Sequence, residues 1–257
     1  MGSSAALAPF RARPADAAVV VDFDGTLSPI VDDPAAARAA DGAAEALVAL
    51  AARLGLVAVM SGRPTDFLRT VLPPGVTLSG LYGLEIVREG VRTDHPDAAT
   101  WRATVADAAR RSAERGPAGM DVEPKGLSLT LHYRRHPEAA DAVAAWAHEE
   151  AARSGLEVRA AKMSIELHPP IAADKGTALE ALAGGFGAVC FVGDDRGDLP
   201  AYDALDRMAA QGVHALRVAV ASDEAPADLL ARADLVLDGP LAVVAFLRRL
   251  AGPPDEC

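Results

Sequence analysis

The sequence predicts an α/β protein built on a doubly wound parallel sheet, with a smaller α+β unit inserted into it. Short apolar runs rich in β-branched residues alternate with longer stretches rich in alanine, leucine and charged residues. Such alternation of strand and helix is typical of a parallel sheet that helices cover on both faces. The alternation stops between about residues 88 and 170. We therefore expect the larger sheet to be discontinuous in sequence, interrupted after its third strand.

The first part of the chain should supply the first strands of this sheet. Residues 17–23 and 54–60 are almost wholly apolar, as the strands of a sheet covered on both faces are. Residues 42–53 and 64–72 follow them and have the composition of helices. The stretch 80–85, which reads GLYGLE, should form a core strand and a turn before the insertion.

After the insertion, apolar runs and helical stretches alternate again, so the second part of the chain should complete the sheet. The expected strands cover residues 188–193, 216–221 and 234–239, and the expected helices cover residues 175–183, 199–209 and 240–250.

The inserted unit has a different order of elements, with strands that follow one another in pairs. We expect helices at residues 96–115 and 137–154, and strands at residues 120–124, 127–134, 156–160 and 162–169. This gives one domain made of residues 1–88 and 171–257, and a second domain made of residues 89–170.

Charge and composition restrict the function classes. The formal net charge is −11 and the charged residues are interspersed, which argues against nucleic acid as a partner because that binding needs clustered Lys and Arg. No run of about 20 apolar residues is present, so we expect no membrane span. The first residues lack the pattern of a signal peptide. The two cysteines have no disulfide or zinc-site spacing, which suits a cytoplasmic protein.

Carboxylates follow two strands of the predicted sheet. Asp22 and Asp24 end the first strand, and Asp194, Asp195 and Asp198 follow the strand AVCFVG. Ligands of open parallel sheets bind beyond the carboxyl ends of the strands. The carboxylates would repel one another there unless a cation lay between them. Oxygen ligands without His or Cys favour Mg²⁺. A single acidic loop is compatible with a solvated turn, but two such loops favour a metal site.

Other strand ends supply groups that suit phosphate. The sequence SGRP places Ser61 and a glycine amide just before a helix, where an anion can bind. Lys175 opens another predicted helix, against the helix dipole, so we expect an anionic neighbour for it; a surface lysine is the simpler alternative. Together with Mg²⁺, these groups favour phosphoryl transfer, with Asp22 as nucleophile and Asp24 as general acid and base.

Four motifs, in the order DFDGT, SGR, DKG and GDDRGD, resemble those of the haloacid dehalogenase superfamily of phosphotransferases. The resemblance implies a Rossmann-like core with a C2-type cap, and an aspartyl-phosphate intermediate on Asp22. It also implies that Asp22, Asp194 and the main-chain carbonyl of Asp24 hold Mg²⁺. Ser61 and Lys175 would then contact the phosphate.

The insertion narrows the resemblance to one family. The stretches DFDGTLSPIVDDP, SGRP, GLYGLE, VEPKGLSLTLHYR and IELHPP together resemble trehalose-6-phosphate phosphatases along nearly the whole chain. That family hydrolyses trehalose 6-phosphate to trehalose and inorganic phosphate, in trehalose biosynthesis. The resemblance implies that Glu123, Lys125 and Glu166 hold the distal glucose. It also implies that Arg134 reaches the phosphate and that Arg63 lies near the interface of core and cap. Composition alone favours a solvent-exposed cap sheet.

The last motif departs from the family pattern GDDRTDE, because Gly197 and Leu199 stand where Thr and Glu are usual. Metal binding should persist because the aspartates remain, while the rate and the metal preference stay open. Two other functions stay open. One is a related phosphatase that acts on sucrose phosphate, mannosylglycerate phosphate or a hexose phosphate. The other is a non-catalytic protein that binds a sugar phosphate. The sequence leaves the oligomeric state open, a monomer included.

Overall fold

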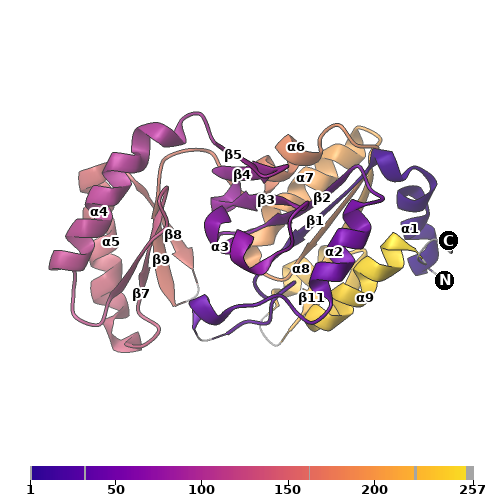
Figure 1. Cartoon of the computed structure of the whole chain (residues 1–257). Coiled ribbons are helices and arrows are strands. Elements are labelled where there is room, and N and C mark those ends of the chain that lie inside the picture. Colours follow the sequence, from indigo (N-terminus) through magenta and orange to yellow (C-terminus); the bar gives the residue numbers. More distant parts are fainter. Residues whose placement is uncertain (1, 32, 162, 223–224, 253–257) are drawn as a thin grey trace. The chain divides into compact units, whose positions relative to one another are not determined.

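The larger sheet is built around strand β1 (Ala17–Asp22), whose residues are all buried. The computed structural model describes residues 2–31, 33–161, 163–222 and 225–252. Eight strands form this sheet in the order β12-β11-β10-β1-β2-β3-β4-β5 (Figure 1). Neighbours from β12 to β3 are parallel, and β4 is antiparallel to β3. The predicted doubly wound parallel sheet is confirmed, with an antiparallel edge added to it.

The sheet carries helices on both faces, as the alternation in the sequence predicts. Its other strands are β2 (Leu56–Met60), β3 (Thr77–Gly80), β4 (Glu85–Arg88), β5 (Val91–Asp94), β10 (Ala188–Gly193), β11 (His214–Ala221) and β12 (Leu235–Asp238). The helices of this part of the chain are α1 (Gly2–Ala12), α2 (Ala43–Ala51), α3 (Thr65–Val71), α6 (Lys175–Ala183), α7 (Leu199–Ala210), α8 (Ala227–Arg232) and α9 (Gly239–Ala251).

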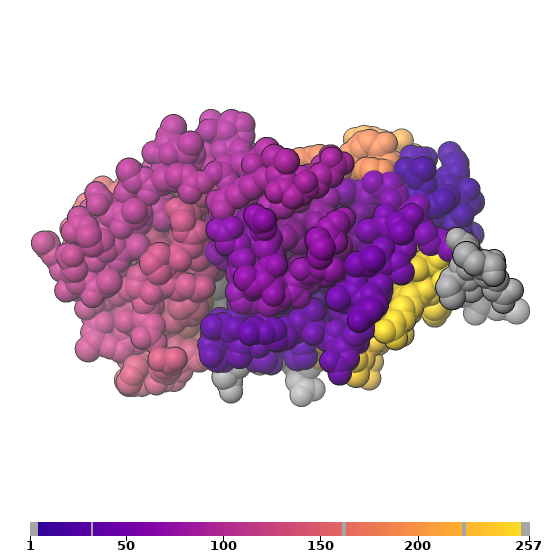
Figure 2. Space-filling model, in the orientation of Figure 1, coloured from indigo at the N-terminus to yellow at the C-terminus, as the bar shows by residue number. Residues whose placement is uncertain are grey.

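Alternate residues of β1 pack into different hydrophobic layers, because successive side chains of a strand point to opposite faces. Val19 and Val21 pack with α1, α2 and α9, whereas Ala18 and Val20 pack with α6, α7 and α8. The side chains of α2 and α9 lie next to each other at the surface of the first layer (Figure 2). Both faces of the central strands are therefore apolar, and polar groups are confined to the strand ends.

The inserted unit has its own sheet and its own core. Helices α4 (Arg102–Arg115) and α5 (Ala140–Ser154) cover one face of a four-stranded sheet of order β6-β7-β9-β8 (Figure 1). Every neighbouring pair in this sheet is antiparallel. Its strands are β6 (Asp121–Pro124), β7 (Leu129–His132), β8 (Glu157–Ala161) and β9 (Ser164–His168).

Contacts within the chain divide it into one unit of residues 1–93 and 173–257 and a second unit of residues 94–172. We call the first unit the core and the second unit the cap. The division falls a few residues beyond the boundaries predicted from the sequence, because β4 and β5 pair within the larger sheet. Within the part of the chain that the structure describes, every helix is too short or too polar to cross a bilayer.

Candidate active site

Asp22 is the last residue of β1 and lies where the order of the core sheet changes direction. From β1 the chain adds β2 and β3 on one side, and β10, β11 and β12 on the other side. The carboxyl ends of strands at such a switch point form the usual binding crevice of an open α/β sheet. Asp22 is only 3% exposed there, so its carboxylate is almost wholly removed from solvent.

Three aspartates from two loops meet at this point. Asp22, Asp194 and Asp198 each offer an oxygen, and these oxygens all lie within 4.8 Å of one another. All three side chains are buried. Burial, opposed by the charge of Lys175, raises the pKa of Asp22 well above its usual value. Burial and the neighbouring charge of Asp198 raise the pKa of Asp194 to about 7. The cluster therefore carries more negative charge than its surroundings accommodate, which is a condition that favours a bound cation.

Lys175 is the one basic group that contacts this cluster among the described residues. It is the first residue of α6, is 4% exposed, and its Nζ donates to Asp22 Oδ1 at 2.7 Å and to Asp198 Oδ1 at 2.5 Å. Burial by itself lowers the pKa of Lys175, but the charges of Asp198 and Asp22 outweigh it and the pKa is raised. The ammonium group therefore stays charged, and the anionic neighbour expected for this lysine is present.

Asp198 holds Lys175 and the loop after β10 in place through hydrogen bonds. Its Oδ2 accepts hydrogen bonds from the main-chain amides of Asp194 at 2.8 Å and of Asp195 at 3.0 Å. The loop after β10 can bend this closely because Gly193 has no side chain; a Cβ there would lie 2.3 Å from Asp198 Cγ. Both oxygens of Asp198 are thus used to hold Lys175 and the loop, so we interpret this residue as a fixed support.

Asp194 is fixed by the loop that follows β1. Thr26 Oγ1 donates to Asp194 Oδ1 at 2.8 Å, so the threonine hydroxyl links the two loops. Gly25 has φ +79, and a Cβ at this residue would lie 2.0 Å from Asp194 Oδ2. The glycine therefore provides both the left-handed turn and the space for the carboxylate.

The donor set fits a divalent cation. Asp22 and Asp194 each use Oδ1 for a neighbouring donor, while their Oδ2 atoms accept no hydrogen bond from the described residues. Carboxylate oxygens with no imidazole or thiolate among them suit a hard cation of the Mg²⁺ type. The side chain of Asp24 lies outside the cluster, and the ligand expected from this residue is its main-chain carbonyl.

Asp24 pairs with Arg63 through two hydrogen bonds. Arg63 Nε donates to Asp24 Oδ2 and Arg63 Nη2 donates to Asp24 Oδ1, both at 2.7 Å. The guanidinium also donates to Pro34 O at 2.7 Å and lies 4.3 Å from the centre of the Phe67 ring. Arg63, which the resemblance assigned to the interface of core and cap, is thus engaged by the predicted acid and base. The pair keeps the Asp24 carboxylate in a fixed position.

Ser61 follows β2 and is 1% exposed. Its Oγ accepts a hydrogen bond from Arg63 N at 3.1 Å, so the hydroxyl hydrogen can be donated to another acceptor. Helix α3 begins at Thr65, and Pro64 before it has no side chain that can cap the helix. The amide of Thr65 instead donates to Glu85 Oε2 at 2.8 Å. The first amide of α3 therefore has a carboxylate of the protein as its acceptor, and the Ser61 hydroxyl remains available for a phosphate.

The cap presents a polar row across the face of its sheet that α4 and α5 do not cover. Glu123 on β6 is paired with Thr130 on β7, which is paired with Glu166 on β9, which is paired with Arg159 on β8. Directly paired residues of antiparallel strands lie on the same face. Leu129, next to Thr130, packs toward the helices instead. The row thus brings the two predicted sugar-binding glutamates onto one face.

Each carboxylate of this row has a partner inside the cap. Ser128 Oγ donates to Glu166 Oε1 at 2.6 Å, and Glu166 is 3% exposed. Glu123 Oε2 lies 2.8 Å from His132 Nε2. Thr130 Oγ1, between the two glutamates, is buried and finds no hydrogen-bond partner among the described residues.

The two predicted basic ligands of the cap lie in turns. Strand β6 ends at Pro124, so Lys125 falls in the turn before β7, where its amide donates to Ser128 O at 2.9 Å. Arg134 is half-buried in the turn after β7.

The structure groups the predicted residues into two sets, one in each unit. In the core, Asp22, Asp194 and Lys175 are in direct contact range, and Asp24 and Ser61 follow the carboxyl ends of the two neighbouring strands β1 and β2. Asp198 was placed in the carboxylate cluster from its motif, but its contacts with Lys175 and with the loop after β10 were not predicted. The contacts of Thr26, Glu85 and Thr130 depend on strand pairing and loop packing, and these three residues were not assigned to the site from sequence.

The chain is similar to several known proteins. Residues 20–233 match the trehalose-phosphatase family. The chain is 40% identical to a trehalose-phosphate phosphatase of Mycobacterium avium (strain 104) over 91% of its own length, and it spans 62% of the length of that relative. Its fold is similar to that of the C-terminal domain of a trehalose-6-phosphate phosphatase of C. albicans, with a TM-score of 0.76, 24% identity, and coverage of 98% of this chain and 97% of the other.

A haloacid dehalogenase-like hydrolase from Bacteroides thetaiotaomicron has the same fold, with a TM-score of 0.62 and 17% identity. The similarity covers 91% of this chain and 98% of that hydrolase. The fold is therefore that of haloacid dehalogenase-like hydrolases, with a Rossmann-like core and a cap.

Proposed function

The chain belongs to the trehalose-phosphatase family, and we propose that it hydrolyses trehalose 6-phosphate to trehalose and inorganic phosphate. The observation that carries the proposal is the position of Asp22: it is buried at the end of β1, bonded to Lys175, and within ligand range of Asp194. A protein that only binds a sugar phosphate has no need for a nucleophile in such surroundings.

In the first step, an oxygen of Asp22 attacks the phosphorus atom. The bond between phosphorus and the sugar oxygen breaks, and the electron pair stays on the sugar oxygen, which takes a proton from the carboxylic acid of Asp24. Trehalose leaves and an aspartyl-phosphate remains on Asp22. Asp24 must first separate from Arg63, because that ion pair occupies both of its oxygens.

In the second step, water attacks the phosphorus atom of the aspartyl-phosphate. The carboxylate of Asp24 takes a proton from this water, the bond between phosphorus and Asp22 breaks, and inorganic phosphate leaves. Lys175 stays charged throughout and offsets the negative charge that develops next to Asp22. The Ser61 hydroxyl can donate to a phosphate oxygen, because its contact with Arg63 N uses an acceptor position of the oxygen and leaves the hydroxyl hydrogen available.

Mg²⁺ is the cation that we propose for the carboxylate cluster. Asp22 and Asp194 would hold it with their side chains, and Asp24 with its main-chain carbonyl. When bound, the cation supplies positive charge that keeps these carboxylates ionised and offsets the charge of the phosphate. Asp198, which is bonded to Lys175 and to two main-chain amides, would hold the loop of Asp194 in place.

Recognition of the sugar is assigned to the cap. Glu123 and Glu166 lie on one face of the cap sheet, and each can accept hydrogen bonds from sugar hydroxyls. We assign Lys125 to the same glucose and Arg134 to the phosphate, as the family resemblance implies. Trehalose 6-phosphate would then be the partner of the site. A cytoplasmic location, the absence of nucleic-acid and membrane partners, and a monomeric state stay predictions.

The test is release of phosphate from a panel of substrates: trehalose 6-phosphate, sucrose 6-phosphate, mannosylglycerate phosphate, glucose 6-phosphate and p-nitrophenyl phosphate. We expect kcat/KM to be highest for trehalose 6-phosphate. A higher value for another sugar phosphate would move the assignment to a related sugar phosphatase. Binding of trehalose 6-phosphate without release of phosphate from any compound would favour the non-catalytic alternative.

A further inference from the structure

Residues 79–85, which we call the clamp segment, run along the loop that contains Ser61. Ser61 N donates to Ser79 O at 2.9 Å, and Tyr82 N donates back to Ser61 O at 3.2 Å. Leu81 N donates to Arg63 O at 3.1 Å. Three main-chain hydrogen bonds thus tie the clamp segment to both sides of the predicted phosphate-binding serine.

Two glycines allow the two segments to approach this closely. A Cβ on Gly80 would lie 2.7 Å from Thr65 N and 2.8 Å from Arg63 O. A Cβ on Gly62 would lie 2.6 Å from Tyr82 Oη. Neither position has room for a side chain, so the contact between the clamp segment and the Ser61 loop is a specific close fit.

The clamp segment adopts an unfavourable backbone to make this fit. Leu81 has φ 49 and Tyr82 has φ 58, a region that residues with a side chain rarely adopt, and Gly83 follows with φ 97. Consecutive residues in this conformation persist only where the surrounding structure holds them, and such places are frequent at functional sites.

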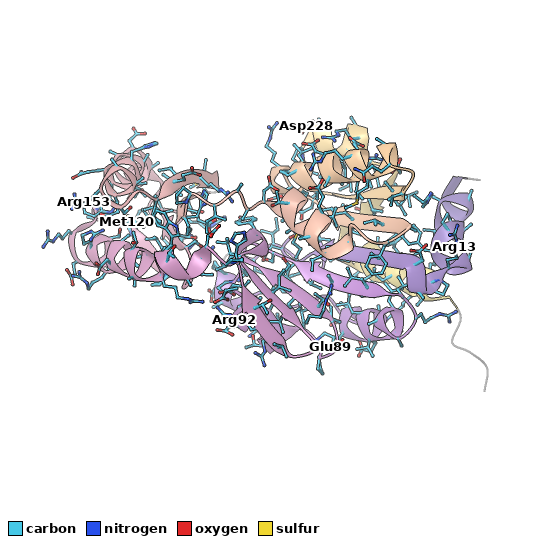
Figure 3. All side chains as sticks on the ribbon, turned by 90° about the horizontal axis from the view of Figure 1, so that it is seen from above. Arg13, Glu89, Arg92, Met120, Arg153 and Asp228 are labelled. Atoms are coloured by element: carbon cyan, nitrogen blue, oxygen red, sulfur yellow. The ribbon has the colours of Figure 1, made fainter. Side chains whose placement is uncertain are left out.

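Glu85 ends the clamp segment with a side chain that reaches the start of α3. Its Oε2 accepts from both the amide and the hydroxyl of Thr65, each at 2.8 Å. Its Oε1 accepts from Arg92 Nη2 at 2.6 Å, and Arg92 Nη1 reaches Asp66 at 3.2 Å. Arg92, on the edge strand β5, is labelled in Figure 3. Glu85 is only 1% exposed. Since Pro64 cannot cap α3, this carboxylate provides the acceptor that the helix start lacks.

We propose that Glu85 is a positioning residue for phosphate binding, which acts by fixing Thr65 and thereby the Ser61 hydroxyl and the Gly62 amide. The inference rests on the proposed function, because it requires that the Ser61 loop binds the phosphate group. Arg92 fixes the second oxygen of Glu85, so the carboxylate has one orientation. A loss of this anchor would leave the chemistry at Asp22 intact while the phosphate is held less accurately.

The cap offers a matched control. Glu150 is also 1% exposed and also forms an ion pair with an arginine, since Arg111 Nε donates to Glu150 Oε1 at 3.1 Å. This pair joins α4 to α5 in the cap and has no part in the proposed reaction. Glu85→Gln and Glu150→Gln therefore remove the same charge from the same kind of surroundings.

The experiment measures kcat and KM for p-nitrophenyl phosphate, competitive inhibition by inorganic phosphate, and thermal unfolding, for wild type and both variants. We expect Glu85→Gln to lower kcat/KM by about 10-fold or more and to weaken phosphate inhibition by a similar factor. Glu150→Gln should change both by less than about 2-fold at a comparable loss of thermal stability. Thr65→Val, which removes one donor to Glu85, should have a smaller effect in the same direction, and Thr65→Ser should restore most of it.

Unchanged kinetics and phosphate inhibition in Glu85→Gln, or equal losses in both Glu→Gln variants, would overturn the proposal. If Glu85→Gln does not fold, the Thr65 pair decides, and equal kinetics for Thr65→Val and Thr65→Ser would overturn it. The aryl phosphate separates this result from the proposed substrate, because it needs the phosphate site but no sugar site. If the wild type hydrolyses neither p-nitrophenyl phosphate nor trehalose 6-phosphate, the binding of orthovanadate to wild type and to Glu85→Gln is measured by calorimetry instead. Equal affinities would overturn the inference.

Discussion

The core and the cap both bury carboxylates, but the negative charge is clustered in the core and individually paired in the cap. In the core, Asp22, Asp194 and Asp198 lie together with Lys175 as the one basic group in contact with them among the described residues, and the pKa of each aspartate is raised. In the cap, each buried or half-buried carboxylate has its own partner. Arg111 pairs with Glu150, Ser128 with Glu166, and His132 with Glu123.

This difference indicates that the core and the cap have different functions. Like charges that share one site are unfavourable unless a cation or a reacting phosphate changes the balance, so the core is arranged for electrostatic chemistry. Carboxylates with neutral or single partners keep hydrogen-bonding capacity without excess charge, so the cap is arranged for recognition of hydroxyl groups. Changes in the core should therefore affect every phosphate ester, and changes in the cap should affect only the sugar substrate.

Replacement of Asp22 should have the largest effect. Asp22→Asn removes the nucleophile and should lower kcat by at least about 10³-fold for trehalose 6-phosphate and for p-nitrophenyl phosphate alike. Asp41→Asn, at an exposed aspartate of the core, provides the control and should leave both rates unchanged. If Asp22→Asn retained full turnover, the nucleophile would have to be another residue.

Removal of the divalent metal should have the second largest effect on the rate. Treatment with EDTA should lower phosphate release from both substrates by more than about 10²-fold, because the carboxylate cluster then lacks a compensating charge. Addition of Mg²⁺ in excess should restore the rate. Activity that survives exhaustive chelation would contradict the assignment of Asp22 and Asp194 as metal ligands.

Replacement of a cap carboxylate should separate the two substrates. Glu123→Ala should lower kcat/KM for trehalose 6-phosphate by about 10- to 100-fold, since an acceptor proposed for a sugar hydroxyl is lost, and should leave p-nitrophenyl phosphate within about 2-fold. Glu138→Ala is the matched control, because Glu138 is another cap glutamate beside a histidine, His136, at 3.1 Å. Equal losses on both substrates would remove the distinction between core and cap.

The smallest effect concerns the stability of the cap at low pH. Burial, with a contribution from the charge of Arg159, lowers the pKa of His168 from 6.5 to about 4. The unfolded chain therefore binds the proton more readily between these values, so the stability from His168 is complete above about pH 6.5 and is lost as the pH falls toward 4. Glu157, at 3.7 Å, reduces the loss because it can pair with the protonated ring.

Urea unfolding at pH 7 and pH 5 measures this effect. Wild type should lose up to about 2 kcal/mol more than His168→Gln over this interval. The same loss in both proteins would show that the imidazole is not the group responsible.

The sequence was sufficient to predict the strands that are formed by a continuous run of apolar residues. Buried parallel strands such as β1 and β10 are apolar on both faces, so their positions follow from composition alone. The β4–β5 hairpin was absent from the prediction, because EIVREGVRTD carries five charged residues and its strands lie at the edge of the sheet. Edge strands commonly carry such charges, which conceals them from an apolar pattern.

The site residues also fall into those that could be placed from the sequence and those that could not. Asp22, Asp194 and Lys175 could be placed together because strand ends of a parallel sheet meet at one edge. The pairing of Arg63 with Asp24 could not be deduced, since it depends on the path of the loop and on the position of the Phe67 ring. Glu85 was also not assigned to the site, because nothing in the spacing between residues 65 and 85 indicates that the glutamate reaches the start of α3.

The central pairing of β1 with β10 has a consequence for how the chain folds. The two strands are neighbours in the sheet, but residues of the whole inserted unit separate them in the chain. During synthesis from the N-terminus, β1 therefore leaves the ribosome long before its partner exists, and the ordering entropy of a very long loop opposes their association. The cap is formed by one continuous segment, so it can fold first and shorten the effective distance between the two halves.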